Sequence, residues 1–274
     1  MSKRLMILTG SIFLFIFEEL TSLLQILFGK KKPDKCVILY YHGISTKERK
    51  RFARQMDELL KLCRPVSLDP FCVPRDGCRF AAVTFDDGLI STVENALPEL
   101  ALRQIPSALF IPAGCLGRHS KLRHNLSANH DRVVTAAELK QIAGRMVTIG
   151  SHCLSHRDLM ELDEIEAKDE ITRSKQELEE ILGRPVQFLS FPFGSFGPQH
   201  VTYAREAGYT KVFSISPVLA PMNSGDFIIG RVRVDPSDWR VEFRLKLLGY
   251  YRWLPRAFSL KSRLKRVAFH HFTV

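Results

Sequence analysis

The sequence predicts an α/β fold, in which helices alternate with the strands of a largely parallel sheet that is open or closed into a barrel. Three observations predict it. Short runs rich in β-branched and aromatic residues recur along the chain, helix-like segments lie between them, and polar residues follow several of the runs directly. Parallel strands need crossover connections, which are usually helices, so this alternation is typical of parallel sheets. With 274 residues, the chain is long enough for one large domain.

Seven short segments after Pro33 carry the strand pattern. Each is mostly apolar and is bounded by turn-forming or charged residues, as expected of strands that are buried on both faces. The segments cover residues 36–41, 80–85, 107–112, 146–150, 186–191, 210–216 and 227–234.

Five segments between these strands carry the helical pattern. In the first, Phe52, Met56 and Leu59 recur on one face with the spacing of an amphipathic helix. The second is interrupted by Pro98, which cannot donate a helical hydrogen bond. The helical segments cover residues 51–63, 92–104, 135–144, 163–183 and 197–208.

The net charge of +11 is concentrated at the two ends of the chain. Residues 1–35 carry +3 and residues 240–274 carry +8, which leaves the 204 residues between them neutral. Basic residues next to apolar ones gain free energy at an anionic membrane surface, whereas nucleic-acid-binding proteins carry recognition signatures beyond charge. We therefore expect both termini to contact a membrane surface, and we expect no nucleic acid as a partner.

The N-terminus carries an apolar run that is too short to cross a bilayer without interruption. Residues 5–17 are apolar or small, two glutamates follow at 18 and 19, and apolar residues resume up to residue 28. Thirteen uninterrupted residues fall short of the roughly 20 that a spanning helix needs. The run predicts an interfacial or anchoring helix, with an uncleaved signal anchor and a cleaved signal sequence as alternatives.

The C-terminal end interleaves leucine, tryptophan and phenylalanine with lysine and arginine. This composition is typical of a basic amphipathic tail that lies on a membrane, although a helix covering the bottom of a barrel would have it too. The sequence therefore divides into an apolar membrane-anchor or signal-anchor segment at 1–33, a folded domain at 34–242 and a basic tail at 243–274.

Polar side chains follow the predicted strands at the points where the strands end. His42 follows the first strand, Asp86 and Asp87 follow the second, and His152 lies close behind the fourth. Because the carboxyl ends of parallel strands meet at one edge of a sheet, we expect these carboxylates and imidazoles to lie on one rim.

His152 and His156 are four residues apart, so both imidazoles can reach one ion if the segment coils into a turn. A carboxylate from a neighbouring strand end would complete a set of two histidines and one acid, which leaves positions for water and substrate. Hydrolytic metal sites have this composition. The spacing can also arise by coincidence, because the chain contains nine histidines.

Asp86 and Asp87 offer two carboxylates with different roles. Adjacent residues in an extended segment point to opposite sides, so one acid can bind the ion while the other acts as a base toward water. A metal ion nearby would also hold the pKa of the Asp86 carboxyl down. In the alternative interpretation, Asp87 and Gly88 form only a turn that leads into a helix.

Three motifs carry a resemblance to a known family. They are "TFDDG" at 84–88, "SHCLSH" at 151–156 and "FPFG" at 191–194. In this order and spacing they resemble the motifs of the polysaccharide deacetylase family, also called the NodB-homology or carbohydrate esterase 4 family, over roughly residues 36–235. The resemblance implies a distorted (β/α) barrel of about seven strands that removes acetyl groups from N-acetylated glycans with a divalent metal, most simply Zn²⁺.

The resemblance also implies a role for each matching residue. Asp86 would be the general base. The metal ligands would be Asp87, His152 and His156. Pro192 and Phe193 would line the substrate groove, and the backbone N–H of Phe193 would help to hold the oxyanion of the intermediate.

The chain departs from the family pattern at two of these motifs. Cys153 follows the first motif histidine, where the family usually has a serine or threonine hydroxyl. Ser190 stands where the family usually has an arginine that orients the base, so we expect Arg231 or Arg233 to take that role.

The late Leu-x-His motif, which usually carries the general acid, is not evident in the sequence. In the branch that resembles poly-N-acetylglucosamine deacetylases the strand order is circularly permuted, and the acid histidine lies on the first strand. His42 occupies that position and would protonate the leaving amine, although it could instead only cap a turn. Asp235 and Trp239 superficially fit a further family motif, Asp-x3-Trp, but they arrive one strand late.

Together these observations predict metal-dependent N-deacetylation of an N-acetylated glycan at the bacterial cell envelope, in a membrane-associated protein. The oligomeric state and the side of the membrane stay open: lysines after the apolar run favour the cytoplasm, whereas polymer deacetylases of this kind act outside it. One alternative is deacetylation of a lipid-linked N-acetyl sugar. Another, motivated by Ser190, is a catalytically inactive carbohydrate-binding protein of the same fold.

Overall fold

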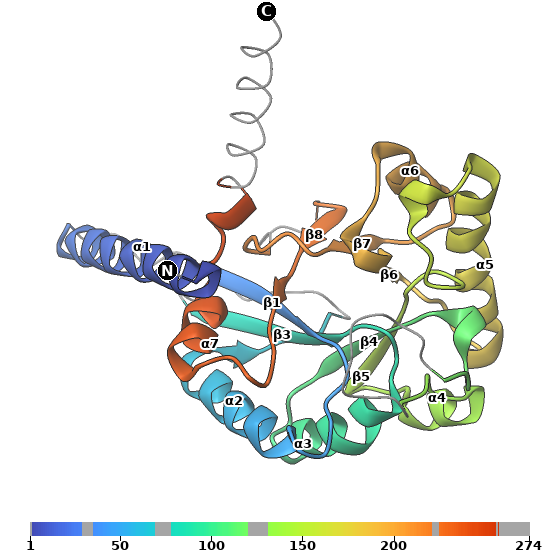
Figure 1. Ribbon diagram of the computed structural model, residues 1–274, viewed down its shortest axis with the longest axis horizontal. Coiled ribbons are helices and arrows are strands. Elements are labelled where there is room, and N and C mark those ends of the chain that lie inside the picture. Colours follow the sequence, from blue (N-terminus) through green and yellow to red (C-terminus); the bar gives the residue numbers. More distant parts are fainter. Residues whose placement is uncertain are drawn as a thin grey trace, which may run out of the picture.

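The computed structural model describes residues 2–28, 35–68, 78–119, 131–220, 225–255 and 257. Its strands form one sheet of nine strands in the order β8-β7-β6-β5-β4-β3-β1-β9, with β2 added beside β3, and all pairings between named strands are parallel. Helices surround the sheet (Figure 1). The predicted α/β barrel is confirmed.

The seven predicted strands are all present, and the last of them is split into two. The bounds are β1 Lys35–Tyr41, β2 Arg64–Pro65, β3 Arg79–Phe85, β4 Ser107–Ile111, β5 Val147–Ser151, β6 Phe188–Ser190, β7 Lys211–Ser214, β8 Ile228–Gly230 and β9 Val232–Arg233. The two-residue strand β2 was not predicted, because so short a segment has no periodicity to detect.

The last two strands close the barrel. β8 pairs with β7 and β9 pairs with β1, so the two ends of the sheet are joined by one continuous stretch of chain. Arg231 is the single residue between β8 and β9. It therefore lies where the chain passes from one edge of the sheet to the other.

The predicted helices are present with small changes at their ends. The bounds are α1 Lys3–Leu27, α2 Arg49–Leu62, α3 Leu97–Leu102, α4 Ala136–Ile142, α5 Glu164–Leu182, α6 Pro198–Glu206 and α7 Arg240–Leu247. Pro98 lies in the first turn of α3, where a missing N–H is tolerated. A π-helical turn at Thr92–Ala96 precedes it. Figure 1 shows α2 to α6 on the outside of the sheet.

Side chains alternate between two apolar layers. On β1, Val37 and Leu39 belong to the layer between sheet and helices, whereas Cys36 and Ile38 belong to a smaller cluster on the other face of the sheet, inside the barrel. The same period of two puts Phe80 and Ala82 of β3 in the inner cluster. Continuing that period, the side chain of Asp86 is expected to point inward at the end of β3.

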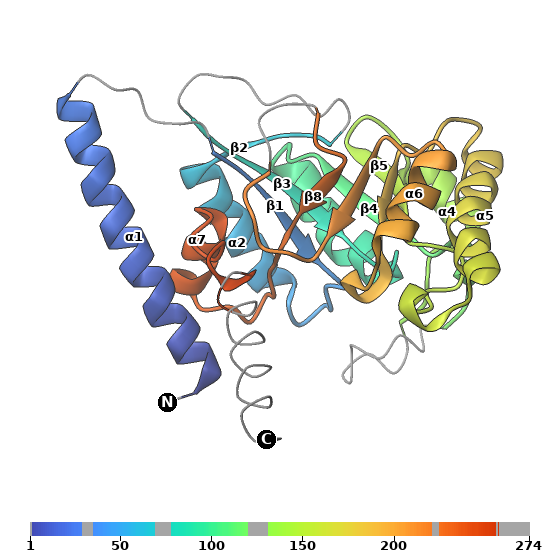
Figure 2. The same ribbon diagram turned by 90° about the horizontal axis from the view of Figure 1, so that it is seen from above.

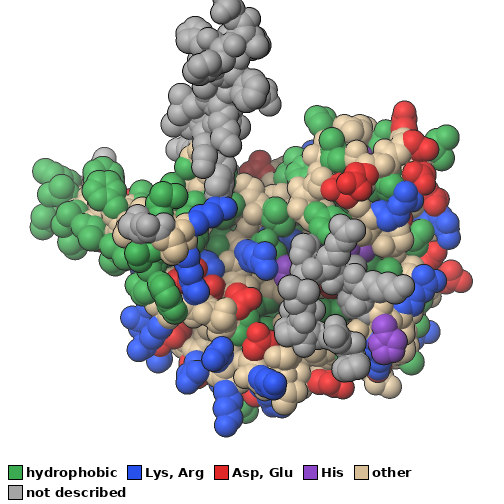
Figure 3. Space-filling model, viewed as in Figure 1, with side chains coloured by type: hydrophobic (Ala, Val, Ile, Leu, Met, Phe, Trp, Pro, Cys, Tyr) green, Lys and Arg blue, Asp and Glu red, His purple; other side chains and the backbone are tan. Residues whose placement is uncertain are grey.

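The N-terminal helix lies outside the barrel. α1 runs along the body beside α7, and the space-filling view shows hydrophobic side chains over its surface (Figure 2, Figure 3). By length and composition, α1 is the one helix in the described ranges that could cross a membrane.

The first part of the predicted C-terminal tail belongs to the folded body. The boundary expected at residue 243 falls inside α7, and Phe243, Leu245 and Leu247 are buried in the main core. Residues 258–274 lie outside the described part of the chain.

Candidate active site

Three strand ends bring the predicted site residues to one rim. Tyr41 of β1 pairs with Phe85 of β3, so His42 and Asp86 follow directly on neighbouring strands. The Asp86 N–H extends this pairing by donating to the Tyr41 carbonyl over 3.0 Å. His152 follows β5 in the same way, and its N–H donates to the carbonyl of the last β4 residue over 2.8 Å.

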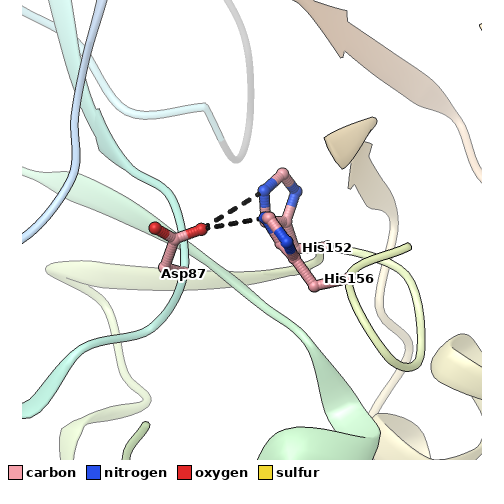
Figure 4. Close-up of side chains that lie close together, drawn as sticks. All are labelled: Asp87, His152 and His156. Carbon is pink, nitrogen blue, oxygen red and sulfur yellow. Dashed lines mark ion pairs between the residues drawn. The ribbon is translucent and has the colours of Figure 1, made fainter. Parts of the chain in front are cut away.

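Asp87, His152 and His156 form a buried cluster whose ligand atoms all lie within 4.8 Å of one another. Asp87 Oδ1 lies 3.6 Å from Nε2 of His152 and 3.2 Å from Nε2 of His156 (Figure 4). For comparison, ligand atoms about 2.1 Å from a tetrahedral zinc ion lie about 3.4 Å apart. The spacing of the cluster therefore fits one small divalent cation.

Unpaired polar atoms in this cluster support the same conclusion. Within the described part of the chain, Asp87 Oδ1 and His156 Nδ1 are buried without a hydrogen-bond partner. Burial raises the pKa of the Asp87 carboxyl, but His156 and the other nearby imidazoles outweigh this effect and lower it to about 2. A buried carboxylate oxygen that faces two imidazole nitrogens is ready to bind a cation.

A hydrogen bond orients the His152 ring so that its Nε2 faces Asp87. Its Nδ1 lies 2.6 Å from the carbonyl oxygen of Ser190, to which it can donate, and this leaves Nε2 to face Asp87. Burial lowers the pKa of the His152 imidazole to about 4, so the ring is neutral near pH 7 and its Nε2 carries a lone pair.

Backbone strain is concentrated at this site. Among the described residues, five that are not glycine have positive φ angles, and four of them belong to the family motifs. The fifth, Gln104, ends a helix elsewhere. Such conformations persist only where surrounding contacts enforce them, and they gather at functional sites. The four are Asp87 at 71°, Cys153 at 60°, His156 at 59° and Phe193 at 59°.

Helix α5 holds the histidine loop in this conformation. Glu170, which is buried, accepts the N–H of Leu154 over 3.0 Å and the N–H of Ser155 over 2.9 Å, and it also accepts the Ser155 hydroxyl. One turn later, Ser174 donates to the Cys153 carbonyl over 2.8 Å. These contacts support the loop although Cys153 has no hydroxyl.

Asp86 is paired with Arg231, one of the two arginines expected as its partner. The guanidinium donates to Asp86 Oδ1 over 2.7 Å and to Oδ2 over 2.8 Å. It also donates to the Ser190 hydroxyl over 2.6 Å and to Thr84 Oγ1 over 3.2 Å. Burial raises the pKa of the Asp86 carboxyl, but the charge of Arg231 and the nearby imidazoles outweigh it, so the pKa lies below its ordinary value.

His42 lies on the same rim, next to the two acids. It is half-buried, its ring is 5.9 Å from that of Tyr40, and positive charge on it lowers the pKa of both Asp86 and Asp87 against the opposing effect of burial.

Pro192 and Phe193 follow β6 on the other side of the histidines. Pro192 is buried, whereas the Phe193 side chain is 40% exposed and its ring lies 4.8 Å from the His156 ring. An exposed aromatic ring beside the cluster of Asp87, His152 and His156 can form one wall of a groove.

Asp235 and Trp239 serve the turn that leads into α7. Asp235 accepts the Ser237 N–H over 2.8 Å. Trp239 is half-exposed, and the Arg4 guanidinium carbon lies over its ring, 4.3 Å from the ring centre. These contacts give neither residue a link to the cluster of Asp87, His152 and His156.

Sequence reasoning missed two supporting residues. Ser190 stands out in the sequence only as a position without the family arginine. In the structure, its carbonyl oxygen can accept a hydrogen bond from His152 Nδ1, and its hydroxyl oxygen accepts one from the Arg231 guanidinium. Glu170 is one of many charged residues of α5, and nothing in the sequence marks it as a contact of the histidine loop. Its spacing from Ile171 and Ser174 would nevertheless put all three on the buried face of the helix.

Residues 74–212, just over half of the chain, match the family model described as polysaccharide deacetylase. The chain belongs to the polysaccharide deacetylase family. It is 25% identical to the YxkH protein of Bacillus subtilis (strain 168) over 220 residues, which cover 76% of this chain and 74% of that protein.

Two further comparisons concern a relative that is named for its glycan and a protein of known structure. The chain is 25% identical to the poly-beta-1,6-N-acetyl-D-glucosamine N-deacetylase of Staphylococcus aureus (strain MRSA252) over 173 residues, 60% of this chain but only 57% of that protein. Among solved structures, IcaB from Ammonifex degensii is similar with a TM-score of 0.63 and 24% identity, over 79% of this chain and 98% of that one. This likeness supports the deacetylase fold.

Proposed function

We propose that this polysaccharide deacetylase hydrolyses acetamide groups of an N-acetylated glycan and that a divalent metal bound by Asp87, His152 and His156 is required. The observation that carries the proposal is the convergence of these three buried ligand atoms beside a separately paired carboxylate, Asp86. Two imidazoles and one carboxylate suit Zn²⁺ best among common divalent ions. When bound, the ion would polarise the acetamide carbonyl and make water more acidic.

Asp86 is the general base in this proposal. It must be ionised to take a proton from the attacking water, and its pairing with Arg231 supports this because the guanidinium lowers the pKa of the carboxyl. The two-point contact also fixes the direction in which the free lone pairs of the carboxylate point.

His42 is the general acid. The nitrogen of an acetamide leaves readily only if it is protonated, and an imidazolium can supply that proton near neutral pH. The position of His42 at the end of β1, directly beside the strand that carries Asp86, supports this role. The backbone N–H of Phe193 would help to hold the negative charge that develops on the acetyl oxygen.

The proposed substrate is a glycan of the bacterial cell envelope. The exposed Phe193 ring beside His156 supports this, because sugar rings stack on aromatic faces that are partly open to water. The name of the S. aureus relative points to a polymer of N-acetylglucosamine as the first substrate to test. We also propose that the enzyme works in contact with a membrane through α1.

A lipid-linked N-acetyl sugar is a second candidate substrate. A cavity of about 470 Å³ lies between the first turns of α1 and the strand-end loops, and its lining includes Lys3, Ile7, Ile215 and Arg233. Ile215 packs directly against Gly194, next to Phe193. Ile215 thus lies between this cavity and the proposed groove, and a sugar attached to a lipid could approach from that side.

The test measures metal content and acetate release on the purified full-length protein. We expect bound zinc, acetate release from N-acetylglucosamine oligomers or from a lipid-linked N-acetyl sugar, and loss of release after treatment with a chelator. The Asp86→Asn variant should keep its zinc and lose at least about 10²-fold in rate. Zinc without turnover on either substrate would instead favour an inactive carbohydrate-binding protein. Loss of zinc in Asp86→Asn would reverse the roles of the two aspartates.

A further inference from the structure

Helix α1 carries an uninterrupted apolar stripe that faces solvent. Its exposed large side chains recur at intervals of three and four residues, as they do on one face of a helix, and they extend to its C-terminal end. Figure 3 shows these hydrophobic side chains projecting from one side of the molecule. The exposed stripe consists of Phe13, Ile16, Phe17, Leu20, Leu23, Leu24 and Leu27.

The opposite face of α1 is fastened to the body. Arg4 donates to Glu242 of α7 over 2.6 and 2.9 Å. Ser11 is fully buried, and its hydroxyl accepts the indole N–H of Trp253 over 3.0 Å. The N-terminal half of the helix is therefore held by side-chain hydrogen bonds as well as by apolar contacts.

The two glutamates that interrupt the apolar run belong to this fastened face. Glu18 pairs with Lys35 at the start of β1 over 3.0 Å, and Glu19 pairs with Arg79 at the start of β3 over 2.5 Å. Glu19 also accepts the Tyr250 hydroxyl over 2.8 Å. The acids that would oppose insertion of α1 into lipid are thus turned toward cations of the body.

This attachment is incompatible with a membrane-crossing α1. Contacts with the body run from Arg4 to Glu19, a distance of about 22 Å along a helix that rises 1.5 Å per residue. If the helix crossed a bilayer of about 30 Å, these contacts would have to break and both glutamates would enter the hydrocarbon region. In Figure 2, the first turns of α1 lie beside α7, and the helix slants outward toward its C-terminal end.

We propose that α1 lies in the plane of an anionic membrane surface, with its apolar stripe inserted into one leaflet and its polar face fixed to the body. This inference rests on the proposed membrane contact and specifies its geometry. A lipid surface fits better than a protein because the stripe contains no polar side chain to select a partner, while the chain carries +3 in residues 1–35 and +8 in residues 240–274.

Flotation with lipid vesicles tests the proposal on full-length protein. We expect the protein to float with phosphatidylcholine vesicles that contain phosphatidylglycerol and to float less with phosphatidylcholine alone. The double variant Phe17→Ser and Leu20→Ser should weaken binding by at least about tenfold, because each side chain loses most of its apolar surface. The matched control is Leu102→Ser with Ile165→Ser, two positions that are 78% and 82% exposed on other helices and should leave binding unchanged.

Extraction of native membranes with alkaline carbonate separates the two membrane geometries. An in-plane helix is released, which supports the proposal. Protein that resists carbonate has a spanning helix, which overturns the in-plane geometry but keeps the membrane contact. Absence of flotation overturns both, and a dimer in solution that the Phe17→Ser and Leu20→Ser variant dissociates would assign the stripe to a second copy of the chain. None of these outcomes depends on deacetylase activity.

Discussion

Arg231 lies between the two closing strands and pairs with Asp86. It thus takes the place of the arginine that the family usually has at the position of Ser190. Its guanidinium is fully buried and makes four hydrogen bonds, two of them to Asp86. Ser190 and Thr84 accept two further guanidinium N–H groups, whereas Arg231 Nε is buried without a hydrogen-bond partner among the described residues, so the satisfaction of this buried ion pair is incomplete. Ser190 is thus adapted to an arginine that comes from another strand.

Replacing Arg231 should shift the pH dependence of the enzyme. Arg231 lowers the pKa of the Asp86 carboxyl, so Arg231→Gln raises it. The base works only when ionised, and activity is therefore lost as the pH falls through this pKa. We expect the acidic limb of the kcat/KM profile to move to higher pH in Arg231→Gln.

The control for this experiment is Ser190→Ala, which keeps both contacts between Arg231 and Asp86. Its acidic limb should stay close to that of the unaltered protein. An acidic limb that does not move in Arg231→Gln would mean that Asp86 is not the group that titrates in catalysis.

At the scale of elements, α5 acts as a support for the loop that carries both histidines. Glu170 and Ser174 lie one helical turn apart and contact three consecutive residues of that loop. Because the loop contains two residues with positive φ, its conformation depends on such external contacts.

Removing the Glu170 side chain should therefore weaken metal binding without touching a ligand. We expect Glu170→Ala to lower zinc affinity by about 10- to 100-fold, as supporting contacts around metal ligands typically do. Competition with a coloured chelator measures this affinity. Glu166→Ala is the matched control, since Glu166 lies one turn earlier on α5 with an exposed side chain paired to Arg157. Equal affinity in both variants would mean that Glu170 has no role in the metal site.

At the scale of the whole molecule, the proposed metal site joins segments that are far apart in the chain. Asp87 follows β3, the histidines follow β5, and α5 and β6 hold the histidines in place. A ligand that binds only the folded state stabilises it in proportion to the logarithm of its concentration. The metal should therefore stabilise the whole barrel rather than one loop.

Zinc should raise the melting temperature of the protein. At about 100 times its dissociation constant, the ion contributes about 2.7 kcal/mol to the free energy of unfolding, which corresponds to about 5–10 °C in a domain of this size. Calorimetry with zinc and with a chelator measures the difference, and His152→Ala should abolish it. A metal-independent melting temperature would count against a site built from Asp87, His152 and His156.

The sequence predicted the rim because strand ends are local features. His42, Asp86 and His152 each follow a run whose apolar pattern can be read without knowledge of the fold. The choice of Arg231 over Arg233 could not be predicted, because it depends on how β8 and β9 close the sheet, between residues far apart in the chain. Likewise, the fastened face of α1 depends on Lys35 and Arg79, and nothing in the helix itself indicates them.

The two strands that close the barrel also bring Arg231 to Asp86, the proposed base. Because Arg231 is the single residue between the two closing strands, a chain that has collapsed around its apolar interior but has not docked these strands would leave Asp86 unpaired and misdirected. Closure of the barrel and pairing of the Asp86 carboxylate thus both depend on the position of Arg231.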